Sequence, residues 1–120
     1  MSSTVYAIGR LVDEHSAHRA RLLDVIRRTY REAEIGDGVR LWSSNDDWRT
    51  RWREYLPGVG RVILCPGPHG EVGLGGLQEV VDAWIAGVPV EVATTEGVRP
   101  LERLTLGTEV LDLSSVAVAT

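Results

Sequence analysis

The chain has 120 residues, a net charge of −4 and a hydrophobic fraction of 43%, which together predict one globular domain over residues 1–120. It contains no apolar run near the ~20 residues of a membrane span and no signal-peptide pattern, so we expect a cytoplasmic protein without a membrane partner. All 13 basic residues are arginines, but acidic residues are interleaved with them, which argues against a nucleic-acid polymer as partner.

The chain opens with a strand pattern followed by a helix pattern. Residues 4–8 form an apolar run that predicts a buried β-strand, and Gly9 ends it. A helix is then expected from a cap at Asp13 or Ser16 to about Ile35, because apolar residues recur there at helical spacing with charged residues between them.

Further strands and helices are expected in alternation. Residues 43–46 supply loop and cap residues before the second helix, and a glycine-rich loop precedes the third. Residues 95–120 predict a β-rich extension and tail, with β-like segments at 101–106 and 110–113. The expected strands are residues 39–42, 61–65 and 89–94, and the expected helices run to about Leu56 and over residues 77–86, with Gly87 as C-cap.

This alternation predicts an α/β fold. We expect a three-layer, mainly parallel, doubly wound sheet of the Rossmann or flavodoxin-like type, with helices on both faces and extra C-terminal β segments. The core is expected over about residues 4–94. Ligands bind such sheets outside the carboxyl ends of the strands, and Gly9, Trp42 and the loop at 66–76 all fall at that edge.

The loop before the third helix is the segment richest in functional signals. Residues 67–76 contain five glycines, and Glu79 is expected in the first turn of the helix that follows. A strand, a glycine loop and a helix N-terminus together present backbone N–H groups to an anionic or polyhydroxylated ligand. Two alternatives stay open: the glycines serve only tight turns, and Glu79 only complements the helix dipole.

The same segment resembles the nucleoside 2-deoxyribosyltransferase superfamily and its nucleotide N-glycosidase relatives. Those proteins carry a glycine-rich loop, a glutamate early in the helix, an alanine, and a Gly-Lys-Pro-Val step into a strand. Residues 5–9 are also similar to the family's first strand and substrate loop, and the resemblance covers about residues 4–94. The matching residues are Gly73-Leu74-Gly75-Gly76-Leu77-Gln78-Glu79, then Ala83, then Gly87-Val88-Pro89-Val90, with the family's eight-residue step from glutamate to glycine.

The resemblance implies that Glu79 is a nucleophile that attacks the anomeric carbon of a (deoxy)ribosyl group and releases the base. An oxocarbenium-like transition state favours a carboxylate beneath the sugar ring. The expected ligand is a nucleoside or nucleotide, with no cofactor, and the expected assembly is a homo-oligomer, a dimer or higher. The substrate-binding residues implied are Tyr6, Gly9, Trp42, His69, Gly73, Gly75 and Gly76.

Two other functions stay open. Relatives place an aspartate near the positions of Arg51 and Trp52, and this chain has none there, which favours a non-catalytic nucleotide-binding or sensing domain. A structural or assembly protein is the third reading, in which the tryptophans make subunit contacts. Cys65 ends a buried strand and suits a packing role, and no His, Cys or Asp spacing indicates a metal site.

Overall fold

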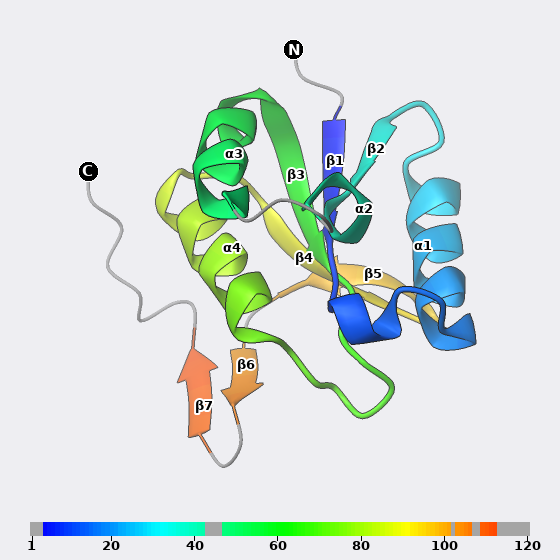
Figure 1. Cartoon of the computed structure of the whole chain (residues 1–120). Helices are drawn as coiled ribbons and strands as arrows, with labels where there is room; N and C mark the ends of the chain where they lie inside the picture. The colour runs from blue at the N-terminus through cyan, green and yellow to red at the C-terminus, as the bar shows by residue number, and fades with distance from the viewer. Residues whose placement is uncertain (1–3, 43–46, 102, 107–108, 113–120) are drawn as a thin grey trace.

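The computed structural model describes residues 4–42, 47–101, 103–106 and 109–112. Its centre is a five-stranded sheet in the order β2-β1-β3-β4-β5 (Figure 1). The first four strands are parallel and β5 runs antiparallel to β4, so the expected α/β class with a mainly parallel sheet is confirmed. The strands are β1 (Thr4–Ile8), β2 (Glu34–Asp37), β3 (Val59–Leu64), β4 (Val90–Thr94) and β5 (Gly97–Pro100).

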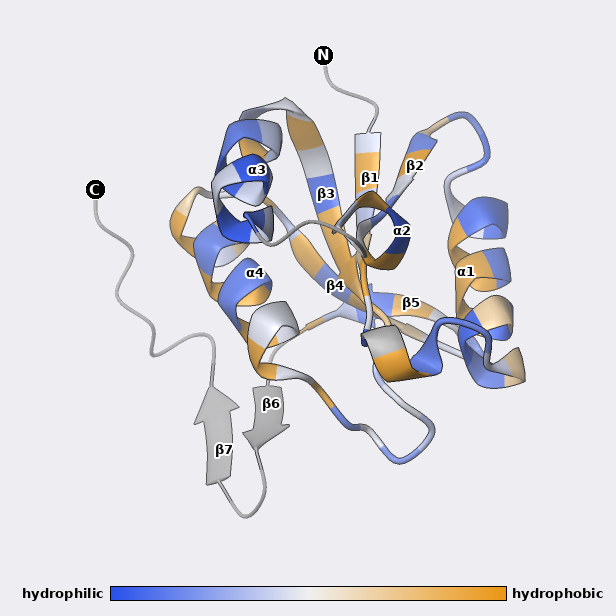
Figure 2. Ribbon diagram, viewed as in Figure 1, coloured by the Kyte–Doolittle hydropathy of each residue, from blue (hydrophilic) through white to orange (hydrophobic). Residues whose placement is uncertain are grey.

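Helices pack on both faces of this sheet. Alternate residues of β1 point to opposite faces: Val5 and Ala7 pack against α1, whereas Tyr6 and Ile8 pack against α3 and α4. Figure 2 shows hydrophobic residues along the central strands, as expected for strands covered on both faces. The helices are α1 (Ala17–Thr29), α2 (Gly38–Trp42), α3 (Trp48–Tyr55) and α4 (Leu74–Ile85), with 3-10 turns η1 (Leu11–Asp13) and η2 (Leu56–Gly58).

The first helix is shorter than its pattern predicts. It starts after Ser16, whose hydroxyl oxygen accepts a hydrogen bond from the Arg19 amide at 3.0 Å, so the second of the two expected caps is the one used. The predicted end near Ile35 is wrong, because α1 ends at Thr29. Ile35 belongs to β2 and pairs with Val5 in a parallel register.

The second strand was expected at residues 39–42, and this prediction is wrong: β2 lies before them, at Glu34–Asp37. Residues 39–42 belong to α2 instead. Asp37 is the reason: its Oδ1 accepts a hydrogen bond from the Val39 amide at 3.1 Å, which is the bond of a helix N-cap. The aspartate ends the strand and starts a helical turn within two residues, and α2 brings Trp42 over the end of β1.

The later elements follow the expected order with shifted boundaries. β3, α3 and β4 lie where the sequence predicts them, and Gly87 has the positive φ of 76° expected after a helix end. However, α4 begins at Leu74 rather than residue 77, so the expectation that Glu79 lies in the first turn is wrong. It lies in the second turn, and Gly75 and Gly76 belong to the helix.

The C-terminal region contains more β-structure than predicted. β5 pairs with β4 over residues 97–100, which were not assigned to a strand. β6 (Arg103–Leu106) and β7 (Glu109–Asp112) form a separate antiparallel pair close to the expected β-like segments. The expected loop at 43–46 and the tail from residue 113 lie outside the described residues. Within the described part of the chain, no helix is both long and apolar enough to cross a membrane.

Candidate functional site

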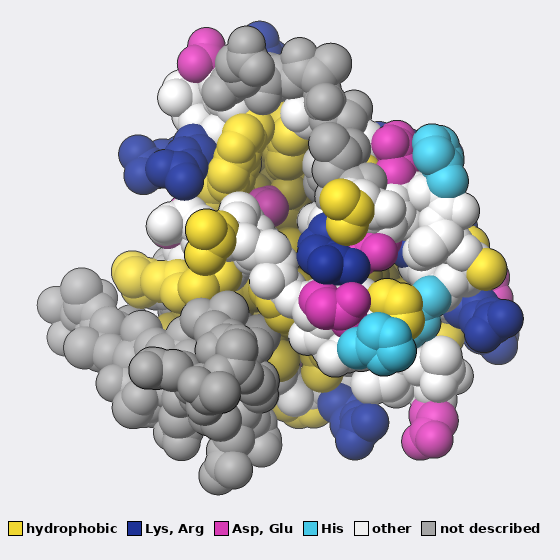
Figure 3. Space-filling view, turned by 60° about the horizontal axis from the view of Figure 1, so that its bottom comes forward, with side chains coloured by type: hydrophobic (Ala, Val, Ile, Leu, Met, Phe, Trp, Pro, Cys, Tyr) yellow, Lys and Arg dark blue, Asp and Glu magenta, His cyan; other side chains and the backbone are white. Residues whose placement is uncertain are grey.

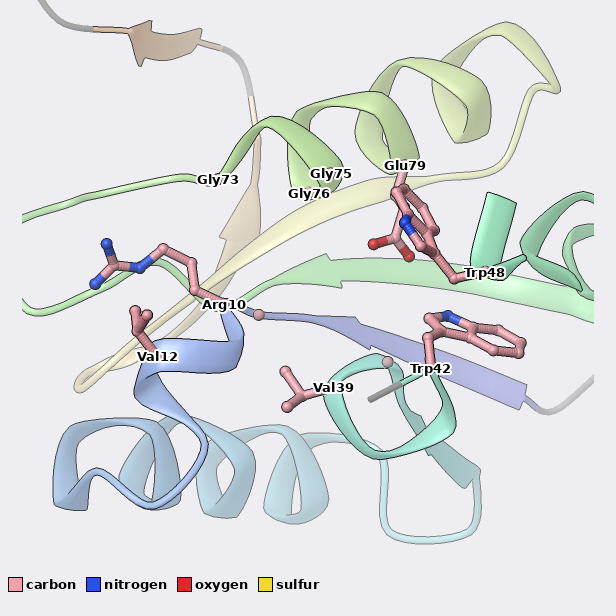
Figure 4. Close-up of a pocket in the computed structure, with 11 residues that line it drawn as sticks. Arg10, Val12, Val39, Trp42, Trp48, Gly73, Gly75, Gly76 and Glu79 are labelled. Carbon is pink, nitrogen blue, oxygen red and sulfur yellow. The ribbon is translucent and has the colours of Figure 1, made fainter. Parts of the chain in front are cut away.

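A cavity of about 530 Å³ opens at the carboxyl edge of the parallel strands. It is formed by the segments that follow β1, β2 and β3, where open α/β sheets bind ligands. Figure 3, which views this edge, shows an acidic side chain set among hydrophobic ones. The cavity is lined by Gly9, Arg10, Val12, Gly38, Val39, Trp42, Trp48, Gly73, Gly75, Gly76 and Glu79 (Figure 4).

Glu79 is the buried carboxylate of this cavity. Its residue is only 6% exposed, because the second turn of α4 faces β1. The Tyr6 hydroxyl donates a hydrogen bond to Glu79 Oε2, and the Trp42 indole N–H donates to the Tyr6 hydroxyl oxygen at 2.6 Å. The indole N–H can only donate, which sets the direction of the first bond, and the carboxylate form of Glu79 can only accept, which sets the direction of the second. Three elements distant in sequence thus meet at one carboxylate.

Burial controls the ionisation of this group. Desolvation raises the pKa of Glu79 to about 7; the hydrogen bond from Tyr6 lowers it and the nearby Asp82 raises it further. Burial, together with the neighbouring Glu79 carboxylate, raises the pKa of Tyr6 well above its usual range, so its hydroxyl keeps the proton that it donates. Glu79 is therefore close to half ionised at neutral pH.

Aromatic rings surround this pair. The Tyr6 ring packs against Trp52 and Tyr55, with centroid distances of 4.6 and 5.6 Å. Trp52 is fully buried and its N–H donates to Asp82 Oδ2 at 3.1 Å, so it belongs to the core. Trp48, one turn earlier on α3, lines the cavity instead. Trp48 and Trp52, four residues apart on α3, therefore have different roles.

The glycines let the helices approach the sheet closely. A Cβ at Gly76 would lie 3.0 Å from Ile8 Cγ2, and one at Gly75 would lie 3.3 Å from the Trp48 ring. A Cβ at Gly38 would lie 2.9 Å from the backbone oxygen of Ala7 and would overlap the Tyr6 ring. Gly38 excludes a side chain because α2 packs directly over β1, and Gly76 and Gly75 leave little room for one against Ile8 of β1 and Trp48 of α3.

Arg10 is the cation of the cavity wall. Its guanidinium donates to both carboxylate oxygens of Asp13, at 2.8 and 3.0 Å, and to Glu71 Oε2 at 3.3 Å. Figure 4 shows it directed away from Glu79. Glu71 also accepts the backbone N–H of His69, so this network ties the loop after β3 to the segment after β1.

The structure brings most of the expected site residues together. Tyr6 lies behind Glu79 and is fully buried, so it contacts the carboxylate and does not line the cavity. His69 is exposed on the loop and is not among the lining residues. The expected residues that line the cavity are Gly9, Trp42, Gly73, Gly75, Gly76 and Glu79.

Sequence reasoning assigned no role to Arg10, Gly38 or Val39, which also line the cavity. Their signal was positional: each follows directly after a strand of the parallel sheet. Cys65 packs in the core on the α1 side of the sheet, and burial raises the pKa of its thiol to about 12.

No group of three or more His, Cys, Asp and Glu side chains in the described ranges is arranged to hold a metal ion. Comparison with known proteins finds no matching family model, curated protein or solved structure.

Proposed function

We propose that this chain binds a nucleoside or nucleotide and cleaves or transfers its N-glycosidic bond, with Glu79 as the nucleophile. The observation that carries the proposal is a buried carboxylate facing a cavity of about 530 Å³ whose other walls are glycines, valines, tryptophans and Arg10. A pocket that is mostly apolar with few polar groups, one of them with a raised pKa, is the usual form of a small-molecule site.

The chemistry follows from the two oxygens of Glu79. Tyr6 engages Oε2, which leaves Oε1 to attack the anomeric carbon C1′ of the sugar. As the C–O bond forms, the bond from C1′ to the base nitrogen breaks and its electron pair leaves with the base, which takes a proton from water. A water molecule or a second base then attacks C1′ and displaces the carboxylate.

Substrate binding would use the walls of the cavity. The rings of Trp42 and Trp48 provide apolar faces on which a planar base can stack. The first amides of α4, at the end that Gly73 caps without a side chain, can bind a 5′-hydroxyl or 5′-phosphate. The strand order with helices on both faces supports a doubly wound, flavodoxin-like or Rossmann-like class. The proposed membership of the nucleoside 2-deoxyribosyltransferase-like superfamily rests on the resemblance of residues 73–90 to that family.

A non-catalytic nucleotide sensor is the second candidate. One observation favours it: Glu79 is the only carboxylate among the described residues that line the cavity, so no second acid is placed there to protonate the leaving base. An assembly protein is supported less well, because Trp52 is used in the core and Trp42 and Trp48 line the cavity.

The test is base release. The purified chain is incubated with a panel of nucleosides and 5′-monophosphates, and free base is followed by chromatography. Release by the wild type, its loss in Glu79→Gln and its retention in Glu96→Gln, an exposed residue of the β4–β5 turn, would support the enzyme. Ligand-induced melting shifts without release would favour the sensor, and neither result with any compound would refute both. Light scattering of the same preparation tests the proposed homo-oligomer.

A further inference from the structure

When Glu79 is ionised, the hydrogen bonds that run from Trp42 through Tyr6 to Glu79 have a fixed direction. Trp42 Nε1 is a donor only, and it lies 2.6 Å from the Tyr6 hydroxyl oxygen. It therefore takes up acceptor capacity on that oxygen, and the hydroxyl proton is directed to the other neighbour, Glu79 Oε2. Without the indole N–H, the hydroxyl would be free to turn its proton elsewhere.

We propose that Trp42 is a positioning residue for Glu79: its indole N–H orients and polarises the Tyr6 hydroxyl, which in turn holds Oε2 and leaves Oε1 presented to the cavity. This inference rests on the proposed function for its catalytic meaning, but the orientation itself is a property of the free protein. This inference also changes the role expected of Trp42 in substrate binding. Because its N–H is engaged by Tyr6, this side chain offers a substrate its ring face and no hydrogen-bond donor.

The surroundings hold all three groups in place. The Tyr6 ring is fully buried between Trp52 and Tyr55, and the Trp42 ring meets Tyr55 edge-on at a centroid distance of 5.8 Å. Gly38, at the start of α2, permits this approach, because any Cβ there would overlap the Tyr6 ring. The indole is thus held by two contacts, the bond to the Tyr6 hydroxyl and the edge-on contact with the Tyr55 ring.

Few other groups act on the ionisation of Glu79. β1 contributes Tyr6, α4 itself contributes Asp82, and the segment after β1 contributes Arg10, whose guanidinium is directed away and paired with other carboxylates. The described parts of α2 and α3 line the cavity with Val39, Trp42 and Trp48, which carry no charge. A change at Trp42 that removes only its N–H should therefore reach Glu79 through Tyr6.

The experiment measures the pKa of Glu79 in the free protein. The side-chain carboxyl carbon is followed by 13C NMR between about pH 4 and 9, with the signal assigned by its absence in Glu79→Gln. Trp42→Phe keeps an aromatic ring and removes the N–H, and Trp48→Phe is the matched control on the same cavity. Tyr6→Phe gives the full effect of losing the hydroxyl. Benzothienylalanine incorporated at position 42, which replaces only the N–H by sulphur, serves if Trp42→Phe does not fold.

We expect Tyr6→Phe to raise the pKa of Glu79, since the hydroxyl bond favours the charged carboxylate. Trp42→Phe should also raise the pKa of Glu79, by roughly 10–30% of the Tyr6→Phe shift. This is the strengthening expected when one hydrogen bond polarises the next. Trp48→Phe should leave this pKa unchanged. An unchanged or lowered pKa in the Trp42 variant, or an equal shift in the Trp48 variant, would overturn the proposal. Because no turnover is needed, failure of base release in the wild type would refute the proposed function and leave this result standing.

Discussion

Replacing Glu79 by glutamine should make the protein more stable at alkaline pH. The carboxyl of Glu79 has a pKa of about 7 in the folded chain against an ordinary value of 4.5. Between these values the folded state holds a proton that the unfolded state has released, so the wild type loses stability as pH rises through this window. Glutamine has no proton to lose, and its carbonyl oxygen can still accept the bond from Tyr6.

The size of the effect follows from the pKa difference. A shift of about 2.5 pH units corresponds to about 3 kcal/mol once Glu79 is fully ionised in both states. Conversion to a free energy is reasonable here because the residue is only 6% exposed. The difference in unfolding free energy between Glu79→Gln and wild type should thus grow by about 3 kcal/mol in favour of the variant from about pH 4.5 to about pH 8.5.

The assay is urea unfolding of both proteins at the two pH values, with the difference taken at each. Titration of all other groups cancels in that difference if they do not contact Glu79. Glu96→Gln, on the exposed β4–β5 turn, is the control for removing a surface carboxylate. A Glu79→Gln difference that is equal at both pH values would refute the view that the carboxylate is buried and costly to ionise.

Three further results are expected. Base release should rise with pH through a midpoint near 7 and level off above about 8, because only ionised Glu79 attacks; a rate that falls over that range would contradict the assigned role. Gly38→Ala should lower the unfolding free energy by roughly 1–3 kcal/mol through overpacking, whereas Gly58→Ala, whose Cβ meets nothing within 4 Å, should change it by less than about 0.5 kcal/mol; equal effects would be evidence against the close approach of α2 to β1. Cys65 should react with a thiol reagent only as fast as the chain opens, since it is buried and burial raises the pKa of its thiol to about 12; rapid reaction of the native protein would show the thiol to be accessible.

The strands that the sequence predicts are those buried on both faces. β1 and β3 contain runs of buried apolar residues, which are typical of central parallel strands, and β4 buries Val90 and Ala93 on opposite faces of the sheet. β2 was missed because it lies at the sheet edge and Ile35 is its only large apolar residue, whereas residues 39–42 contain three. The outcome was decided by the side chain of Asp37, whose bond to the Val39 amide starts a helical turn. The spacing of hydrophobic residues in the sequence does not reveal a side-chain bond of this kind.

The candidate site, like the fold, could be predicted only in part from the sequence. Glu79 and the three glycines before it lie in one segment, so their density was visible in sequence. The bond between Tyr6 and Glu79 spans 73 positions and depends on which helix covers the Tyr6 face of β1. Arg10 sits in no motif, and its pairing with Glu71 across the loops could not be predicted without the fold.

The structure also separates the two explanations that the sequence left open for Glu79. A glutamate that only complements the helix dipole lies in the first turn and is solvated, and its loss lowers stability. Glu79 lies in the second turn and is buried, and its ionisation opposes folding at neutral pH, so packing gives no reason for a carboxylate at this position. A role toward a ligand does give one. If Glu79→Gln is more stable than the wild type above pH 7 and releases no base, the carboxylate is a functional group whose burial lowers the unfolding free energy. A loss of stability in the same variant above pH 7 would show that the carboxylate stabilises the fold, and would contradict a role for Glu79 toward a ligand alone.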